Sequence, residues 1–261
     1  MSEGFEIVCE IEPATTPDLR LVRHQIGVLS SISSSFLIPD NHIGRATVSS
    51  IAVAHEVLLM GGRAIACLNA RDRNTLGFRR DLLTAAAYGV REFLFVYGDR
   101  PEPGRRSDDL TVQTMIEQAR RFADEHCAGT GSIRIGVSSR LGPMPAWKDQ
   151  ADFVFAQVGF SWDRLLRWRE TVTFHGPVYA GVMVVASAGM GLKLSAEIPQ
   201  LAVPERLLAR LADDASAGVE HACEMVAQVR GSDAFAGVHL IPVRRYREVA
   251  QRLEALVPRP K

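Results

Sequence analysis

The chain lacks an excess of charge of either sign, because its 30 lysine and arginine residues are matched by 30 aspartate and glutamate residues. Proteins that bind nucleic acids usually carry a basic excess that neutralises phosphate groups, so we expect no nucleic-acid partner. No apolar run approaches the roughly 18 residues that a membrane span requires. The first residues also lack a basic region followed by an apolar segment. We therefore expect a cytoplasmic protein with no membrane partner.

Cysteine is scarce, and no pair has the close spacing of a zinc or redox site. The four cysteines are Cys9, Cys67, Cys127 and Cys223. His42 can be paired with His55 as metal ligands. His221 can likewise be grouped with Glu220 and Glu224, but neither set has a recognised ligand spacing. We therefore expect no metal site.

The composition is that of a folded globular protein, with 47% hydrophobic and 23% charged residues in a chain of 261. Short runs rich in β-branched and aromatic residues alternate with longer stretches of helical periodicity. The predicted strands are residues 5–11, 34–38, 64–69, 92–97, 133–138, 153–158, 178–184 and 237–241. The predicted helices are residues 18–30, 45–60, 74–88, 108–126, 162–173, 204–229 (as two helices) and 244–256, with a turn or two of helix at 146–150.

This alternation of strands and helices indicates βαβ units and a parallel sheet. Eight such units in about 250 residues favour a (β/α)8 TIM barrel over an open doubly wound sheet. A dinucleotide-binding sheet would need a glycine-rich turn after its first strand, and Glu10-Ile11-Glu12-Pro13 is not such a turn. No low-complexity linker interrupts the chain, so we predict a single barrel domain over residues 1–261.

Polar residues gather at the ends of the predicted strands, where barrel enzymes carry their chemistry. Glu10 and Glu12 are two residues apart at the end of the first strand, so they point to the same face if the strand continues. Two carboxylates on one enclosed face repel, which favours keeping a proton on one of them. Such a group can act as a general acid. In the alternative, the strand has ended and only Glu10 faces the interior.

Two further polar residues follow the fourth and sixth predicted strands. Asp99 lies in a Gly-Asp turn, in which Gly98 permits a tight bend, and its carboxylate can accept hydrogen bonds from a heterocycle. Gln157 follows Phe153 and Phe155 at strand spacing and shares their face, where its amide can both donate and accept. The alternatives are an ordinary loop turn and a core glutamine satisfied by backbone groups.

The charged segment of residues 69–74 follows the third predicted strand and opens a helix. Its arginines either meet a phosphate near the helix start or form a structural pair with Asp72. Residues 188–192 are glycine-rich but match neither the P-loop nor the dinucleotide-binding fingerprint, so we predict a loop there.

In their order along the chain, these motifs resemble the methylenetetrahydrofolate reductase family. Glu10-Ile11-Glu12-Pro13 is similar to the strand end Phe-Glu-Phe-Phe-Pro-Pro with which that family opens. The other similar segments are residues 70–83 (an Arg-Asp-Arg-Asn run followed by Asp-Leu-Leu), 97–101 (a Gly-Asp-Pro-Pro turn) and 156–168 (a Thr-Gln-Phe-Phe-Phe strand and the helix after it). The resemblance covers nearly the whole chain.

The resemblance implies a barrel that holds FAD and reduces 5,10-methylenetetrahydrofolate to 5-methyltetrahydrofolate with NADH or NADPH. It implies that Glu10 is the general acid that opens the folate ring and that Asp99 acts near the flavin and pterin edges. Gln157 would hydrogen-bond the folate, and we assign Glu12 and Phe160 to substrate binding beside it. Members of the family are often homo-oligomers.

Residues that we assign to cofactor binding lie after the third, fourth and fifth predicted strands. They are Asn69, Arg71, Tyr97, Gly98, Ser138 and Arg140. Several positions depart from the family: Phe36-Leu37-Ile38-Pro39 replaces its Val-Thr-Tyr-Gly, Ala66 stands near its histidine, residues 138–141 replace its Ala-Tyr-Pro-Glu, and Lys148 is a displaced counterpart of its lysine. Most of these positions are flavin contacts in the family.

Several functions therefore remain open. The first is a reductase that uses FAD, or that passes hydride directly from NADH or NADPH to the folate. The others are a non-catalytic folate- or flavin-binding barrel and a reductase of another C1 carrier. The proton donor Glu10 favours an enzyme.

Overall fold

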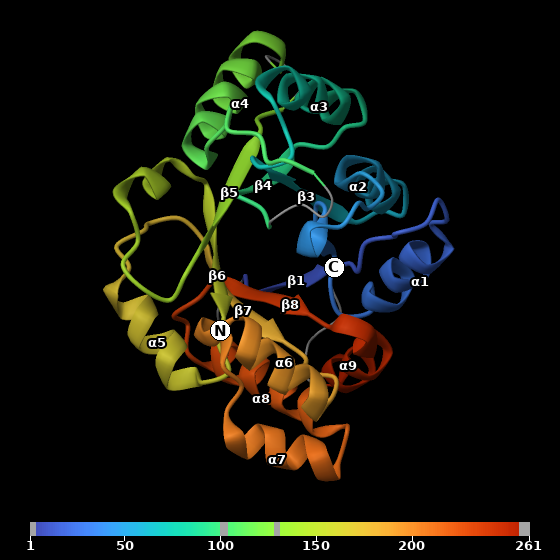
Figure 1. Ribbon diagram of the computed structural model, residues 1–261, viewed down its shortest axis with the longest axis vertical. Coiled ribbons are helices and arrows are strands. Elements are labelled where there is room, and N and C mark those ends of the chain that lie inside the picture. The colour runs from blue at the N-terminus through green and yellow to red at the C-terminus, as the bar shows by residue number, and fades with distance from the viewer. Residues whose placement is uncertain (1–3, 100–103, 128–130, 256–261) are drawn as a thin grey trace.

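The computed structural model describes residues 4–99, 104–127 and 131–255. Arg100 and Pro101, which end the predicted Gly-Asp turn motif, lie outside these ranges. The chain forms a closed barrel of parallel strands in which each strand pairs with the next, and β8 pairs with β1. Figure 1 shows the strands ringing the centre and the helices outside them. The predicted (β/α)8 barrel is confirmed.

Each predicted strand overlaps an observed one. The strands are β1 (Glu6–Glu10), β2 (Ser35–Ile38), β3 (Arg63–Asn69), β4 (Glu92–Val96), β5 (Arg134–Ser139), β6 (Phe153–Val158), β7 (Val178–Met183) and β8 (Gly237–Ile241). The helices are α1 (Arg20–Leu29), α2 (Ser50–Leu59), α3 (Thr75–Ala87), α4 (Val112–His126), α5 (Trp162–Thr171), α6 (Ala188–Glu197), α7 (Glu205–Asp213), α8 (Ala217–Gly231) and α9 (Tyr246–Glu254). Short 3-10 turns lie at η1 (His42–Gly44), η2 (Ala146–Gln150), η3 (Pro199–Leu201) and η4 (Val243–Arg245).

The prediction of a loop at residues 188–192 is wrong, because these residues form the first half of α6. The backbone N–H of Met190 donates to Oγ of Ser187 at 3.2 Å, so Ser187 caps the helix. A side chain at Gly191 would lie 2.5 Å from Leu208, so this glycine lets α6 pack closely against α7. Capping and packing outweigh the low helix propensity of the two glycines.

Two predicted helices begin too early. The predicted helix 45–60 begins at Ser50, and the predicted helix 108–126 begins after Thr111. Thr111 caps α4 by accepting from the N–H of Thr114, whose hydroxyl in turn accepts from the N–H of Thr111. A cap of this kind sets the first helical residue more strongly than the apolar periodicity does.

Alternate strand residues fill the inside of the barrel. The buried interior residues are Val8, Leu37, Ile65, Cys67, Leu94, Phe153, Phe155 and Tyr179. Gly136 on β5 makes room for the ring of Phe153, because a Cβ at this position would lie only 2.0 Å from it. The intervening strand residues, such as Ile7 and Phe36, face outward and form the main core with the helices.

A charged network occupies the amino ends of the strands. The guanidinium of Arg63 binds the carboxylates of Glu6 and Glu92, and Arg134 also binds Glu92, at 3.1 Å. The hydroxyl of Tyr179 donates to Glu6 at 2.7 Å. Burial raises the pKa of Glu6, but hydrogen bonds from Ser35 and Tyr179 and the charge of Arg63 hold it below its usual value. Such pairing stabilises the end of a barrel opposite to the one that carries chemistry.

Candidate active site

Glu10 and His239 form a hydrogen-bonded pair inside the barrel. Oε2 of Glu10 lies 3.0 Å from Nε2 of His239, and their side chains are only 16% and 10% exposed. The imidazole stacks on the ring of Phe155, with centroids 4.9 Å apart and planes 18° apart. Phe155 in turn meets Tyr179 edge to face at 5.1 Å. The imidazole that binds the Glu10 carboxylate is thus fixed in place by buried aromatic rings.

Strand alternation explains why these side chains meet. On β8, Val238 and Leu240 are buried in the outer core, so His239 between them faces inward. In the register of β1 and β8, His239 lies opposite Val8, one inward position before Glu10. The sequence interpretation missed His239. The sequence pattern could have identified it, because His239 is the one polar side chain in the apolar strand Gly237–Ile241.

Glu12 does not share a strand face with Glu10, because β1 ends at Glu10. The backbone of Glu12 leaves the strand and bonds the buried amide of Gln25, which accepts from its N–H at 3.0 Å and donates to its carbonyl at 3.3 Å. The side chain of Glu12 is exposed. The predicted strand 5–11 is therefore too long, and the alternative in which only Glu10 faces inward describes the structure.

Gln157 lies at the end of β6, where the strand is irregular. The pairing with β7 shifts between Phe155 and Val158, so the strict alternation that predicted one face for Phe155 and Gln157 breaks down at this point. A side chain on Gly181 would lie 2.6–2.9 Å from the backbone of β6 there, so Gly181 permits the irregularity. Gln157 is exposed, unlike Phe155.

Asp99 binds a neighbouring loop. Its Oδ2 accepts the backbone N–H of Ile43 at 3.0 Å. Ile43 has a φ of 58°, a left-handed conformation that is strained for a β-branched residue. Asp99 therefore holds the η1 turn after β2 in place at the mouth of the barrel.

Asn69 and Gly98 are also engaged within the protein. Asn69 is 1% exposed, and its amide nitrogen donates to Asp40 at 2.8 Å and to Asp72 at 2.9 Å. Asp40 also pairs with Arg73. A side chain on Gly98 would lie 2.8 Å from Cβ of Asn69, and Gly98 has a φ of 94°, which only glycine adopts readily. These residues form the rim of the barrel at the carboxyl ends of β3 and β4.

Three cationic side chains and one tyrosine also lie near the ends of strands. They are Arg71, Arg140, Lys148 and Tyr97. The guanidinium of Arg71 lies 4.8 Å from the ring centroid of Tyr97, and its Nε is buried with no hydrogen-bond partner. Lys148 donates to the carbonyl of Ser138 at 2.8 Å. Burial and the charge of nearby Arg140 lower the pKa of Lys148.

Arg71 and Arg140 offer donors to an anionic group, whereas Asn69 and Asp99 are engaged with other residues of the protein. Arg71 and Arg140 are cations after β3 and β5, and the unpartnered Nε of Arg71 is a donor that an anion can satisfy. The amide hydrogens of Asn69 are both taken up. Asp99 already accepts from Ile43.

Phe160, which the sequence assigned to substrate binding, lies apart from the Glu10 pair. It is buried against residues of α7 and the end of β7, and it lines a separate pocket with His221 and Glu224. Among the described residues, no group of three or more His, Cys, Asp or Glu side chains is arranged to hold a metal ion. No helix in these ranges is both long and apolar enough to cross a membrane.

Comparisons with known proteins bear on the family and the fold of this chain. Residues 147–256, which include the similar segment 156–168, match the family described as methylenetetrahydrofolate reductase, so the resemblance to this family is confirmed over that part of the chain. A search of curated proteins finds no match to the chain.

Similar solved structures are barrels of low sequence identity. An uncharacterized protein from Clostridium thermocellum that binds two copies of 5-methyl-5,6,7,8-tetrahydrofolic acid is 10% identical, with a TM-score of 0.63 over 97% of this chain and 96% of that one. A β-1,3-glucanosyltransferase from Rhizomucor miehei is 11% identical, with a TM-score of 0.57 over 92% and 88%. A long-chain alkane monooxygenase is 7% identical, with a TM-score of 0.56 over 98% and 92%. At these identities the likeness shows the fold alone.

Proposed function

We propose that this barrel is a folate-dependent oxidoreductase that reduces 5,10-methylenetetrahydrofolate to 5-methyltetrahydrofolate with NADH or NADPH. The observation that carries the proposal is Glu10, a carboxyl group inside the barrel that is held by His239, whose ring stacks on Phe155. The match of residues 147–256 to the reductase family supports it. The C. thermocellum barrel that binds 5-methyl-5,6,7,8-tetrahydrofolic acid supports a folate ligand.

Glu10 supplies the proton that the reaction needs. Protonation of a nitrogen of the five-membered folate ring lets its bond to the methylene carbon break, which leaves an iminium carbon. NADH or NADPH supplies the hydride that converts this carbon to a methyl group. A carboxyl group must be protonated to act in this way, and the hydrogen bond to His239 gives Glu10 a neighbour through which the lost proton returns.

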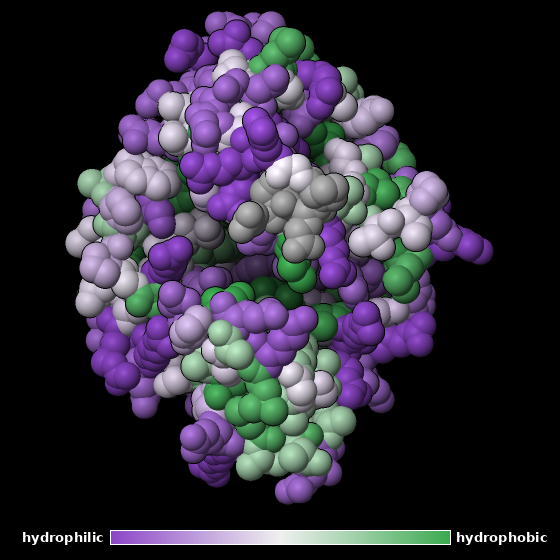
Figure 2. All heavy atoms as spheres, viewed as in Figure 1, coloured by the Kyte–Doolittle hydropathy of each residue, from purple (hydrophilic) through white to green (hydrophobic). Residues whose placement is uncertain are grey.

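The surrounding residues position the reactants. Phe155 is only 2% exposed and stacks on His239, so it fixes the imidazole that binds Glu10. Gln157, exposed at the end of β6, provides donors and an acceptor for the edge of that ring. Arg71 and Arg140 face the anionic part of the nucleotide or of the folate tail. Figure 2 shows a hollow at the centre of the face that overlies the ring of strands.

Direct transfer of hydride from the nicotinamide to the folate agrees with the engaged rim residues. Asn69 and Asp99, which the resemblance would place at a flavin, are bound to Asp40, Asp72 and the loop at Ile43. The second candidate is a non-catalytic folate-binding barrel. The structural neighbour that binds 5-methyl-5,6,7,8-tetrahydrofolic acid favours it, whereas a binder has no need of a buried carboxyl group beside the ligand.

The test is oxidation of NADH and of NADPH driven by 5,10-methylenetetrahydrofolate, with protein checked by absorbance for flavin and assayed before and after adding FAD. Activity without flavin supports direct transfer. Activity only with FAD keeps the reductase and refutes the direct route. Folate binding without oxidation of either nucleotide, with or without FAD, refutes the reductase and establishes the binding protein.

A further inference from the structure

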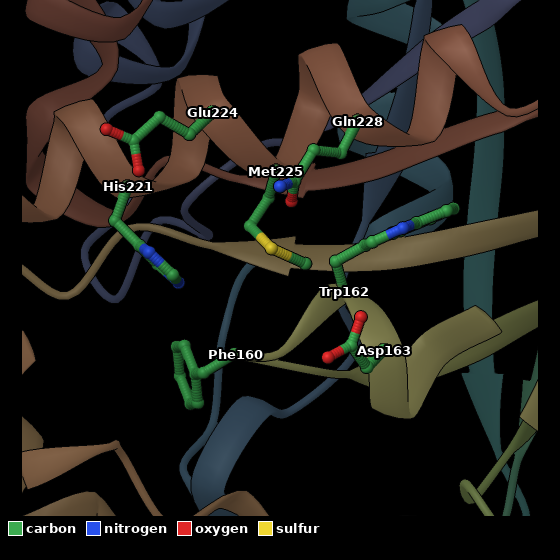
Figure 3. A pocket seen from close by; sticks show the side chains of 7 residues that line it. All are labelled: Phe160, Trp162, Asp163, His221, Glu224, Met225 and Gln228. Atoms are coloured by element: carbon green, nitrogen blue, oxygen red, sulfur yellow. The ribbon is translucent and has the colours of Figure 1, made fainter. Parts of the chain in front are cut away.

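A second pocket lies outside the barrel, between α8 and the segment that joins β6 to α5. Its volume is about 280 Å³, close to the lower end of the range for small-molecule sites. Figure 3 shows the lining side chains, which come from α8, from Phe160 and from the start of α5; the ring of Trp162 points away from those of Phe160 and His221. Its lining residues are Phe160, Trp162, Asp163, His221, Glu224, Met225 and Gln228. Neither Glu10 nor His239 is among them, so the pocket is separate from the candidate active site.

The helical spacing of α8 explains one wall. Four lining residues of α8 stand at positions 221, 224, 225 and 228, the i, i+3, i+4, i+7 spacing of one helix face. The opposite wall is aromatic. Phe160 lies 6.4 Å from the ring of His221, and Trp162 is braced edge to face against Phe235 at 6.3 Å. With Met225, these rings give the pocket flat apolar sides.

The charged groups of this pocket are the carboxylates of Asp163 and Glu224, which are acceptors. No hydrogen bond or ion pair within the described residues engages the carboxylates of Asp163 or Glu224. Nε2 of His221 is buried and has no partner, although a buried polar atom is usually satisfied. The amide of Gln228 both donates and accepts, and the indole N–H of Trp162 donates.

His221 adds a third polar group to the pocket wall. Burial lowers the pKa of His221 below its usual value, against the opposing effect of Glu224. Its Nε2 has no hydrogen-bond partner, and either nitrogen of the neutral ring can carry the proton.

We propose that this pocket binds a small flat molecule with a donor edge in which one carbon carries both an amino group and a second N–H, such as an amidinium, a guanidinium or a 2-aminopyrimidine ring. The two carboxylates accept from that edge, and Phe160 and Trp162 stack on or flank its plane. An anion is excluded by the two unpaired carboxylates. A metal ion is not supported, because the described residues hold no suitable cluster of three ligands.

Calorimetric titration of the full-length protein with benzamidine and with benzamide tests the donor edge. The two probes have the same ring, but benzamide lacks the charge and the second nitrogen. We expect benzamidine to bind and benzamide to bind at least tenfold more weakly. Titration with pterin, which carries a neutral 2-aminopyrimidine edge, distinguishes a heterocyclic ligand from a cationic one. Binding of pterin as tight as that of benzamidine identifies a heterocycle. Weaker binding of pterin identifies a cationic amidine or guanidine.

Variants locate the binding site. Glu224→Gln changes an exposed side chain without endangering the fold and should weaken benzamidine binding about tenfold, the loss of one charge-assisted hydrogen bond. Glu205→Gln removes an equal charge from α7, outside the pocket lining, and should leave binding unchanged. The result that overturns the proposal is equal binding of benzamidine and benzamide, equal binding by the Glu224 variant and wild type, or no binding of benzamidine and pterin at millimolar concentration.

Discussion

Oε2 of Glu10 lies 3.0 Å from Nε2 of His239, although the two residues are 229 positions apart in the chain. The contact spans the seam where the first and last strands close the barrel. It exists because both side chains face inward near the same level of the sheet. The pair connects the proposed proton donor to a second titratable group that the linear sequence does not bring near it.

Glu10→Gln should lower kcat for folate reduction about 100- to 10,000-fold, the usual contribution of a general acid, and leave folate affinity within about twofold. The amide keeps the shape and hydrogen bonding of the side chain but has no proton to give. Steady-state assays and calorimetric folate titration check both parts. Wild-type turnover in this variant would remove Glu10 from the mechanism.

His239→Phe keeps a ring to stack on Phe155 but loses the hydrogen bond to Glu10, whereas His239→Gln keeps a polar partner. We expect kcat to fall about 2- to 10-fold in the phenylalanine variant, the cost of one hydrogen bond, and to be partly restored in the glutamine variant. The pH profile of kcat should also change. Equal losses with an unchanged profile would show that His239 acts only by filling space.

Asp99 can be tested as a tether or as a catalytic group. Asp99→Asn retains an oxygen that accepts from the N–H of Ile43, and Asp99→Ala does not. If Asp99 acts only by holding the loop at Ile43, the alanine variant raises KM several-fold while the asparagine variant stays near wild type. Equal losses of kcat in both variants would instead show that the negative charge acts in catalysis, as the sequence predicted.

Gly136→Ala should destabilise the barrel by about 1–3 kcal/mol, because its Cβ would lie 2.0 Å from the ring of Phe153 in a packed interior. Gly142→Ala is the matched control, since nothing lies within 4 Å of a Cβ there. Urea unfolding monitored by circular dichroism measures both. Equal stability of the two variants would contradict the tight packing inferred for the interior.

Glu6 should make stability depend on acid pH. Its folded-state pKa lies below the usual value of 4.5, so the unfolded chain binds a proton first. The stabilisation is therefore complete above about pH 5 and is lost as the pH falls through the folded pKa. Thermal unfolding from pH 6 to 3 should show a shallower loss for Glu6→Gln than for wild type. The exposed Glu12→Gln variant should follow wild type, and a Glu6 variant that does the same would refute the linkage.

Much of the fold could be predicted because it depends on local patterns. The alternation of apolar strands with amphipathic helices was enough to identify eight strands and the short 3-10 turn between β5 and β6. The errors have local physical causes. The cap at Ser187 and the contact of Gly191 with Leu208 make a helix where glycines suggested a loop. The chain leaves β1 before Glu12 because its backbone bonds Gln25 instead of a neighbouring strand.

The sequence by itself determined the barrel, the inward placement of Glu10 and the family resemblance, since strand alternation and motif order are properties of the chain alone. Only the tertiary structure decided which side chains meet. Closure of the barrel brings His239 to Glu10, and long-range hydrogen bonds commit Asn69 and Asp99 to the rim. The turn after β6 carries Phe160 to α8 rather than to the Glu10 pair. Such contacts depend on through-space distances between residues far apart in sequence, which no local pattern encodes.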